Sequence, residues 1–246
     1  GYRTIEENHS LALDEKAEPL RLEGNPVHED MIEAVSFLED KSMFSIMTVL
    51  NRRQEICSVD AGQLSVSFRD AVKTAEDLYS VQLAESADII VTCAKAPMDL
   101  NLYQAHKAVE NVSSALSPGG TIILVSSCTE GIGDRGFYDL LKEAQNPDEV
   151  FKRIKDNYRL GYHKAAGLAK LLAKPSLYAV TGLEDSILSD IFIKPFCSAQ
   201  AALTEALEVF SSRSGRAPKV LIVPDGTVTV PFLMRRDDVS GDKKTV

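Results

Sequence analysis

Two apolar segments separated by a helical pattern constrain the fold of this chain more than any other feature. Residues 87–94 and 121–127 are almost uniformly apolar, so neither has a polar face, and each suits a buried strand of a parallel sheet. Residues 101–116 between them show a helical pattern, and Pro118-Gly119-Gly120 predicts a turn before the second strand. Strand, helix and strand in this order form a βαβ unit.

The remaining patterns extend this unit into an α/β fold. The apolar segments 44–50 and 56–59 flank a polar turn and predict an antiparallel hairpin, followed by a long helix over 64–83. Further strands are predicted at 177–180, 219–223 and 227–232, and further helices at 137–144, 147–156, 161–173 and 199–211. We therefore expect a layered α/β fold with a mostly parallel central sheet flanked by helices, plus an antiparallel hairpin.

The first forty residues predict two short helices. Thr4 and Glu7 have the spacing of a capping box, which would begin a helix that runs to about Leu13. Residues 28–38 place apolar side chains three and four residues apart, and we expect this helix face to be core. The predicted domains are an N-terminal helix and connector of the inter-domain region over 1–25, a C-terminal α/β domain over 26–234, and a polar tail over 235–246.

Charge and hydropathy exclude several classes of function. The 27 basic and 36 acidic residues give a net charge of −9, so the basic surface of a nucleic-acid-binding protein is missing. The longest apolar run spans only 87–94, far short of the roughly 20 residues of a membrane-spanning helix, and no signal segment opens the chain. The four cysteines are scattered without metal-site spacing. We expect a soluble, cytoplasmic protein with no nucleic-acid or membrane partner.

The carboxyl edge of the predicted sheet is where a ligand is expected to bind. Loops 95–100 and 128–136 follow neighbouring strands and should be adjacent in space. Just inside the next helix, Tyr103, Gln104 and Lys107 fall within one helical turn. A phenol, an amide and an ammonium group on one turn could hold a carboxylate. The alternative is an ordinary solvated helix face with a half-buried tyrosine.

Other chemistry-bearing residues give weaker signals. No pair among the four histidines has zinc-site spacing, and each taken alone is interpreted as a surface or capping residue. The chain has no nucleophile elbow, P-loop or dinucleotide fingerprint. The glycines at 131–136 follow a strand but have the wrong spacing for that fingerprint, so they are only a weak indication of phosphate binding. Glu130 and Asp134 flank that loop as candidate general bases.

Several strings of residues carry a specific resemblance. They are GYRTIEENH at 1–9, GNPVHEDM at 24–31, PMDLNLYQAHKA at 97–108, PGGTIILV at 118–125 and PDG at 224–226. In this order and over nearly the whole chain, they resemble the C-terminal half of the nickel-pincer lactate racemase family. The strings at 24–31 and 97–108 are specific, whereas Pro-Gly-Gly before a strand is not.

The resemblance implies an isomerase, a two-domain 2-hydroxyacid racemase or epimerase with its site between the domains. The implied cofactor is a nickel-pincer nucleotide, pyridinium-3,5-bisthiocarboxylic acid mononucleotide nickel, whose ring carbon accepts the C2 hydride of a small 2-hydroxy acid. A histidine takes the hydroxyl proton, and the 2-keto acid then receives the hydride on its other face. By motif position, His9 matches the nickel ligand, while Tyr103, Gln104 and Lys107 match residues that contact substrate and cofactor, with Gln104 and Lys107 as catalytic residues.

The resemblance also implies that part of the site lies outside this chain. The acid and base histidines and the cofactor-anchoring lysine match the missing N-terminal domain, so we expect the present chain to be inactive alone. The chain has no Trp, whereas some members line the pocket with one from this domain, so the substrate stays open. Two alternatives remain: a methyltransferase-like α/β domain and a non-catalytic module that binds a small acid.

Overall fold

The computed structural model describes residues 1–38, 41–51, 53–156, 158–172 and 176–233. Contacts divide the chain into two compact units. One, the hairpin unit, comprises Gly1–Ser80 and Gly136–Ala169; the other, the sheet unit, comprises Val81–Arg135 and the described residues from Lys170 onward. The predicted tail at 235–246 lies outside the described residues. The domain division expected for a longer enzyme stays a prediction.

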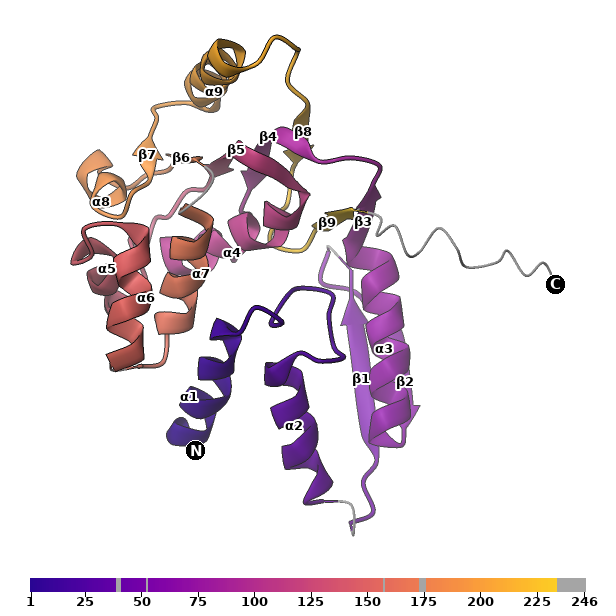
Figure 1. The fold of residues 1–246 in the computed structure, drawn as a ribbon. Helices are drawn as coiled ribbons and strands as arrows, with labels where there is room; N and C mark the ends of the chain where they lie inside the picture. Colours follow the sequence, from indigo (N-terminus) through magenta and orange to yellow (C-terminus); the bar gives the residue numbers. More distant parts are fainter. Residues whose placement is uncertain (39–40, 52, 157, 173–175, 234–246) are drawn as a thin grey trace, which may run out of the picture. The chain divides into compact units, whose positions relative to one another are not determined.

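A five-stranded parallel sheet forms the centre of the sheet unit (Figure 1). Its strands, in spatial order, are β7 (Lys194–Pro195), β6 (Ser176–Val180), β5 (Leu116–Val125), β4 (Ala87–Cys93) and β8 (Val220–Val223). Every adjacent pair is parallel. Together with the antiparallel hairpin described below, this sheet confirms the predicted fold class.

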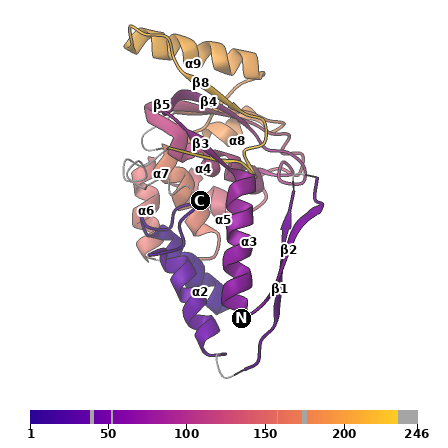
Figure 2. The same cartoon turned by 90° about the vertical axis from the view of Figure 1, so that its right-hand side faces the viewer.

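Helices cover both faces of this sheet, with α4 (Leu102–Val112) on one side and α9 (Ala199–Arg213) on the other (Figures 1 and 2). Ile89 and Ile123 point to the α9 face, where they pack with Ala202 and Ala206. Small alanines let the helix approach the sheet closely. Each large side chain buried in this way contributes about 1.5–3 kcal/mol. A short helix, α8 (Asp185–Ser189), precedes β7; neither was predicted.

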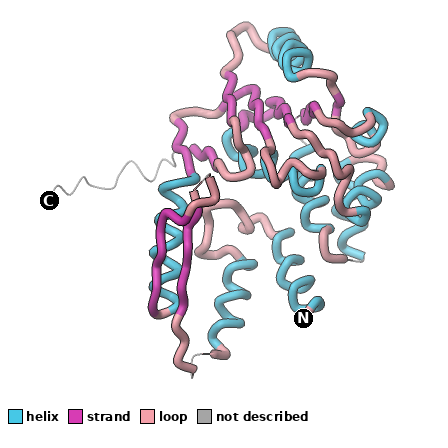
Figure 3. The backbone as a smooth tube through the Cα atoms, turned by 180° about the vertical axis from the view of Figure 1, so that it is seen from behind, coloured by secondary structure: helices cyan, strands magenta, loops and turns pink. Residues whose placement is uncertain are grey.

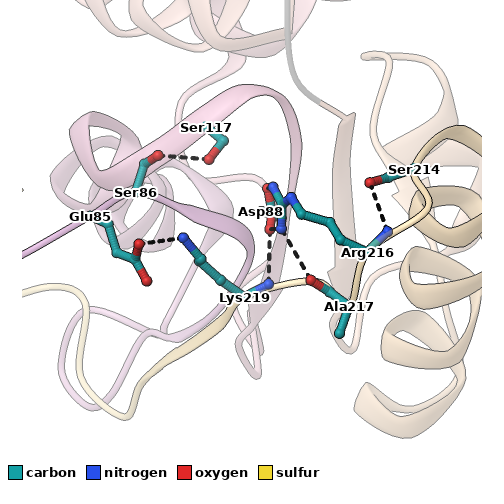
Figure 4. A network of polar contacts seen from close by, with 8 residues as sticks. All are labelled: Glu85, Ser86, Asp88, Ser117, Ser214, Arg216, Ala217 and Lys219. Carbon is teal, nitrogen blue, oxygen red and sulfur yellow. Dashed lines mark hydrogen bonds and ion pairs between the residues drawn. The ribbon is translucent and has the colours of Figure 1, made fainter.

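A buried carboxylate ties the start of β4 to the segment before β8 (Figure 4). Both oxygens of Asp88 accept from the Arg216 guanidinium, at 2.7 and 2.8 Å, and one also accepts from Lys219 N at 2.8 Å. The Asp88 side chain is 5% exposed, whereas that of Arg216 is 54% exposed. The hydrogen bonds from Arg216 lower the pKa of Asp88 against the opposing effect of burial. The charged partner is therefore what keeps this buried carboxyl ionised.

Three predicted element boundaries are wrong. Pro118-Gly119-Gly120 lies inside β5 and not in a turn before it. Ala87 pairs with Leu116 and Ile89 pairs with Thr121, so β5 has extra residues between these two pairs, and the triplet forms a bulge. The predicted helix 64–83 ends at Tyr79, and Ser80–Leu83 is a strand, β3. The last strand, β9, is shorter than predicted at Val230–Leu233, and it pairs with β3 in a separate sheet.

The hairpin unit contains strands β1 (Ser45–Leu50) and β2 (Ile56–Gly62), which pair antiparallel and lie along α3 (Leu64–Tyr79) (Figure 3). Its other helices are α1 (Tyr2–Ser10), a 3-10 turn at Leu11–Leu13, α2 (Pro26–Ser36), α5 (Arg135–Lys142), α6 (Pro147–Asp156) and most of α7 (Tyr162–Leu172). On the hairpin, Val49 is buried, whereas Ile46 and Val59 are 64% and 58% exposed.

The two N-terminal helices begin differently from the prediction. The capping box does not form, because α1 already begins at Tyr2 after Gly1 and has no side-chain cap. In α2, the Asn25 side chain accepts from Val27 N, and Pro26 occupies the first turn. The apolar face of α2 is not core: no residue of this helix is buried. Hydrophobic periodicity predicts that a helix has an apolar face, but it does not show whether another element packs against that face.

Candidate functional site

The loops after β4 and β5 lie against each other, as predicted. Cys128 N donates to Asp99 O and Glu130 N donates to Leu100 O, both at 2.7 Å. The Ser127 hydroxyl donates to the Asp99 carboxylate at 2.8 Å. The carboxyl edge of β4 and β5 is thus one connected surface, and Asp99 of the 97–108 string is a structural residue that joins its two loops.

The first turn of α4 is fully capped. Asn101 Oδ1 accepts from Gln104 N at 3.0 Å, and the amides of Leu102 and Tyr103 donate to carbonyls of residues 131–132 at 3.1 and 3.0 Å. The amides of residues 102–104 are therefore not free to bind a ligand, because each already has an acceptor. A ligand at this helix has to be held by side chains.

The glycine-containing loop serves mainly to cap α4. Gly133 has a φ of +89°, and a Cβ at this position would lie 2.5 Å from Asn101 Oδ1, so a side chain there would displace the cap. Of the two acidic residues proposed as bases, Glu130 is exposed and Asp134 is half-buried. The negative charge of Asp134 contributes to raising the pKa of Tyr103.

Tyr103, Gln104 and Lys107 share one face of α4, because they lie three and four residues apart in an observed helix. Tyr103 and Gln104 are half-buried, and Lys107 is exposed. Burial raises the pKa of Tyr103, and the Asp134 carboxylate acts in the same direction. The phenol therefore stays protonated at neutral pH and can donate a hydrogen bond. The roles of these three residues toward a ligand stay predictions.

One neighbour on this helix contradicts its interpretation as a surface residue. His106 is 1% exposed, and its Nε2 lies 3.9 Å from a Glu110 carboxylate oxygen. It belongs to the buried face of α4, which packs on the sheet, whereas Lys107 one residue later is on the outer face. The two adjacent residues thus have different surroundings.

His9, the predicted metal ligand, lies in α1 of the hairpin unit. It is half-buried, its Nδ1 is buried, and that atom has no hydrogen-bond partner among the described residues. Its ring meets the His163 ring edge to face, with centroids 5.1 Å apart. In the described ranges, no group of three or more His, Cys, Asp or Glu side chains could hold a metal ion. The role of His9 as a metal ligand stays a prediction.

Sequence reasoning missed the partners of His9. The Tyr158 hydroxyl and His163 Nδ1 are 3.0 Å apart, and this pair reaches α1 from about 150 positions along the chain. From the sequence alone, His163 is interpreted, like the other histidines, as a surface or capping residue. No periodic pattern links such distant residues, so a spacing argument could not have found them.

The fold and the α4 face define an α/β domain that offers a phenol, an amide and an ammonium group at the edge of a parallel sheet. The family model for the lactate racemase C-terminal domain matches residues 81–230, more than half of the chain. The chain therefore belongs to the lactate racemase family.

Individual relatives agree with this assignment. The chain is 29% identical over 228 residues to a lactate racemase of Lactiplantibacillus plantarum, covering 92% of this chain and 53% of the relative. It is 28% identical to a lactate racemase of Thermoanaerobacterium thermosaccharolyticum, covering 85% of this chain and 49% of the relative. The chain thus spans about half the length of the curated relatives it matches.

Solved structures show the same fold. The lactate racemase apoprotein from T. thermosaccharolyticum superposes with a TM-score of 0.82 at 27% identity, over 92% of this chain and 55% of that one. A Thermotoga maritima protein superposes with a TM-score of 0.61 at 13% identity, over 85% of this chain, which shows a shared fold alone. No helix among the described residues is long and apolar enough to cross a membrane.

Proposed function

We propose that this chain is the C-terminal part of a nickel-dependent 2-hydroxyacid racemase or epimerase, an isomerase similar to the lactate racemases. The observation that carries the proposal is the α4 face: Tyr103, Gln104 and Lys107 lie together in the segment that matches the family model. Membership of this family argues against the methyltransferase-like alternative.

The α4 residues supply groups that suit a small hydroxy acid. Lys107 is exposed, and among the described residues it has no ion pair, so its ammonium group is available to a carboxylate. Gln104 adds an amide on the same face, and Tyr103 adds a protonated phenol as a hydrogen-bond donor. Because the backbone amides of the α4 terminus are capped, orientation of the substrate falls to these side chains.

His9 is the residue of this chain proposed to bind nickel. A neutral imidazole is a good ligand for Ni(II), and the absence of a multi-residue metal cluster in the described ranges fits a metal carried by a nucleotide with its own donor atoms. When bound, this cofactor supplies a reversible acceptor for the hydride at C2 of the substrate. His9 fixes the position of the metal, and the α4 side chains hold and orient the substrate.

The remaining groups are proposed to lie in the part of the enzyme that relatives have and this chain lacks. These are the histidines that move the hydroxyl proton and the lysine that anchors the cofactor. On this proposal the present chain binds neither substrate nor nickel tightly by itself and does not racemise a 2-hydroxy acid.

The test uses the longer, cofactor-loaded enzyme with enantiopure lactate and related 2-hydroxy acids in deuterated water. The expected result is racemisation of at least one acid with the C2 hydrogen retained, because a hydride that stays on the enzyme does not exchange with solvent. Deuterium at C2 would contradict the hydride route. Binding of the acids without turnover by the nickel-loaded protein would favour the small-acid-binding module instead.

A further inference from the structure

Residues 158–163 hold the predicted metal ligand from outside its own helix. Glu6 and His9 lie three residues apart in α1 and so share one face. A Glu6 carboxylate oxygen accepts from Leu160 N at 2.8 Å. His9 contacts the His163 ring edge to face, at 5.1 Å between centroids and 71° between ring planes. One face of α1 is therefore fixed to this segment at two points.

The orientation of His163 is in turn set by Tyr158. The phenol oxygen lies 3.0 Å from His163 Nδ1, and the Tyr158 ring also meets the Tyr162 ring edge to face, with centroids 6.4 Å apart. His163 is thus held at one nitrogen by a hydrogen bond while its ring packs against His9. Tyr158, His163 and His9 thus form a chain of three residues joined by two contacts.

His9 departs from the usual arrangement of a metal-binding histidine. Such a histidine ordinarily donates its second ring nitrogen to a carboxylate, carbonyl or water, which fixes the ring orientation. His9 Nδ1 is buried and has no such partner among the described residues. Ring packing against His163 is the contact that the structure provides in its place.

We propose that His163, held by Tyr158, is a positioning residue that fixes the ring orientation of His9 by edge-to-face packing. The inference rests on the proposed function, in which His9 binds the nickel of the cofactor. Loss of a group that orients a metal ligand typically lowers metal affinity or activity about 10- to 100-fold. His163→Ala should therefore accelerate nickel loss by a factor in this range.

The first test needs no metal and uses the present chain. Imidazole resonances of His9 in NMR spectra report its orientation through the ring current of His163. His163→Ala is expected to shift and average these signals, whereas His163→Phe keeps a packing ring and should leave them dispersed. Tyr158→Phe removes only the hydroxyl and should broaden the His163 signals. Tyr162→Phe is the matched control, because the Tyr162 hydroxyl bonds to no described residue, and it should change neither histidine.

The second test measures the rate of nickel loss from the longer, cofactor-loaded enzyme with the same four variants. Faster loss is expected for His163→Ala and Tyr158→Phe, and near-normal loss for His163→Phe and Tyr162→Phe. If His163→Ala changes neither the His9 signals nor the rate of nickel loss, the positioning role is wrong. If His163→Phe accelerates nickel loss as much as His163→Ala does, ring packing is not the basis of that role. Full nickel retention in His9→Ala would instead contradict the proposed role of His9 as a nickel ligand. Failure of the positioning role of His163 can therefore be distinguished from failure of the proposed function.

Discussion

The position of Lys107 on α4 leaves its ammonium group exposed to solvent. The neighbouring His106 faces the sheet and is buried, while Lys107 is exposed and, within the described residues, has no ion pair. The helix fixes the backbone of Lys107, but its long side chain still loses rotamer freedom when it binds a carboxylate. On the proposed function, Tyr103 and Gln104 on the same face contact other polar atoms of the substrate.

Replacing Lys107 by Ala in the longer enzyme should reduce kcat/KM for its 2-hydroxy acid at least tenfold. A charge-assisted hydrogen bond contributes about 1.5–3 kcal/mol, and about 1.4 kcal/mol corresponds to a factor of ten. Steady-state racemisation with several candidate acids measures the effect. Lys73→Ala on α3 is the control for loss of an exposed lysine, and unchanged kinetics in Lys107→Ala would remove Lys107 from the site.

The strings that carry the family resemblance contain both candidate binding residues and residues with structural roles. Periodicity could predict that Tyr103, Gln104 and Lys107 share a helix face, because that depends only on local spacing. It could not predict that Asp99 joins two loops or that Asn101 caps α4, since both roles depend on a loop that follows a different strand. The His9–His163 contact was out of reach for the same reason.

At the scale of elements, uniform apolar composition was the reliable signal. β4 was predicted at 87–94 and spans Ala87–Cys93, because only a strand buried on both faces has such a sequence. β7 and α8 have two and five residues, too few to show a period. The end of α3 was missed because Ser80–Leu83 continues the apolar pattern as a strand that pairs with distant β9.

The same contrast between elements predicts how hydrogen exchange varies along the chain. No residue of α1 is buried, whereas β4 is mostly buried and pairs on both sides. Amides of α1 should therefore exchange rapidly by local opening, and those of β4 slowly. Exchange followed by mass spectrometry in the present chain measures both segments. Equal protection of the two would contradict the expectation.

The Asp88 contact predicts a pH-dependent contribution to stability. Asp88→Asn should lower the free energy of unfolding at neutral pH by roughly 2 kcal/mol, near the lower end for charged hydrogen bonds because half of Arg216 remains in solvent. The folded pKa of Asp88 is lowered, so the stabilisation is fully present above the unfolded pKa of about 3.9 and is lost as the pH falls through the folded value.

Urea unfolding of wild type and Asp88→Asn between neutral pH and about pH 3 checks this sign. The difference between the two proteins should be largest near neutrality and should shrink only in acid. Glu85→Ala is the control, since it removes an exposed ion pair with Lys219, which contributes little. If the difference in free energy of unfolding between wild type and Asp88→Asn grows as the pH falls, the prediction is wrong.

At the scale of the whole molecule, the proposed site residues are divided between the two units. The candidate substrate-binding face belongs to the sheet unit, and the candidate metal ligand belongs to the hairpin unit. The hairpin exposes Ile46 and Val59, although the sequence pattern resembles that of a core. Relatives are about twice as long as this chain. On the proposed function, activity is expected only in a longer enzyme that supplies the remaining catalytic groups.

Nickel binding distinguishes a partial site from a complete one. The present chain offers His9 as the proposed nickel ligand, and in the described ranges no group of three or more His, Cys, Asp or Glu side chains could hold a metal ion, so it should bind Ni(II) only weakly. The longer enzyme, made with its cofactor, should carry about one nickel per chain, because most donor atoms would come from the cofactor. His9→Ala in that enzyme should lower nickel content and racemisation together. Elemental analysis and racemisation measured on the same sample decide the matter: full nickel with wild-type activity would show that His9 is an ordinary half-buried histidine of α1.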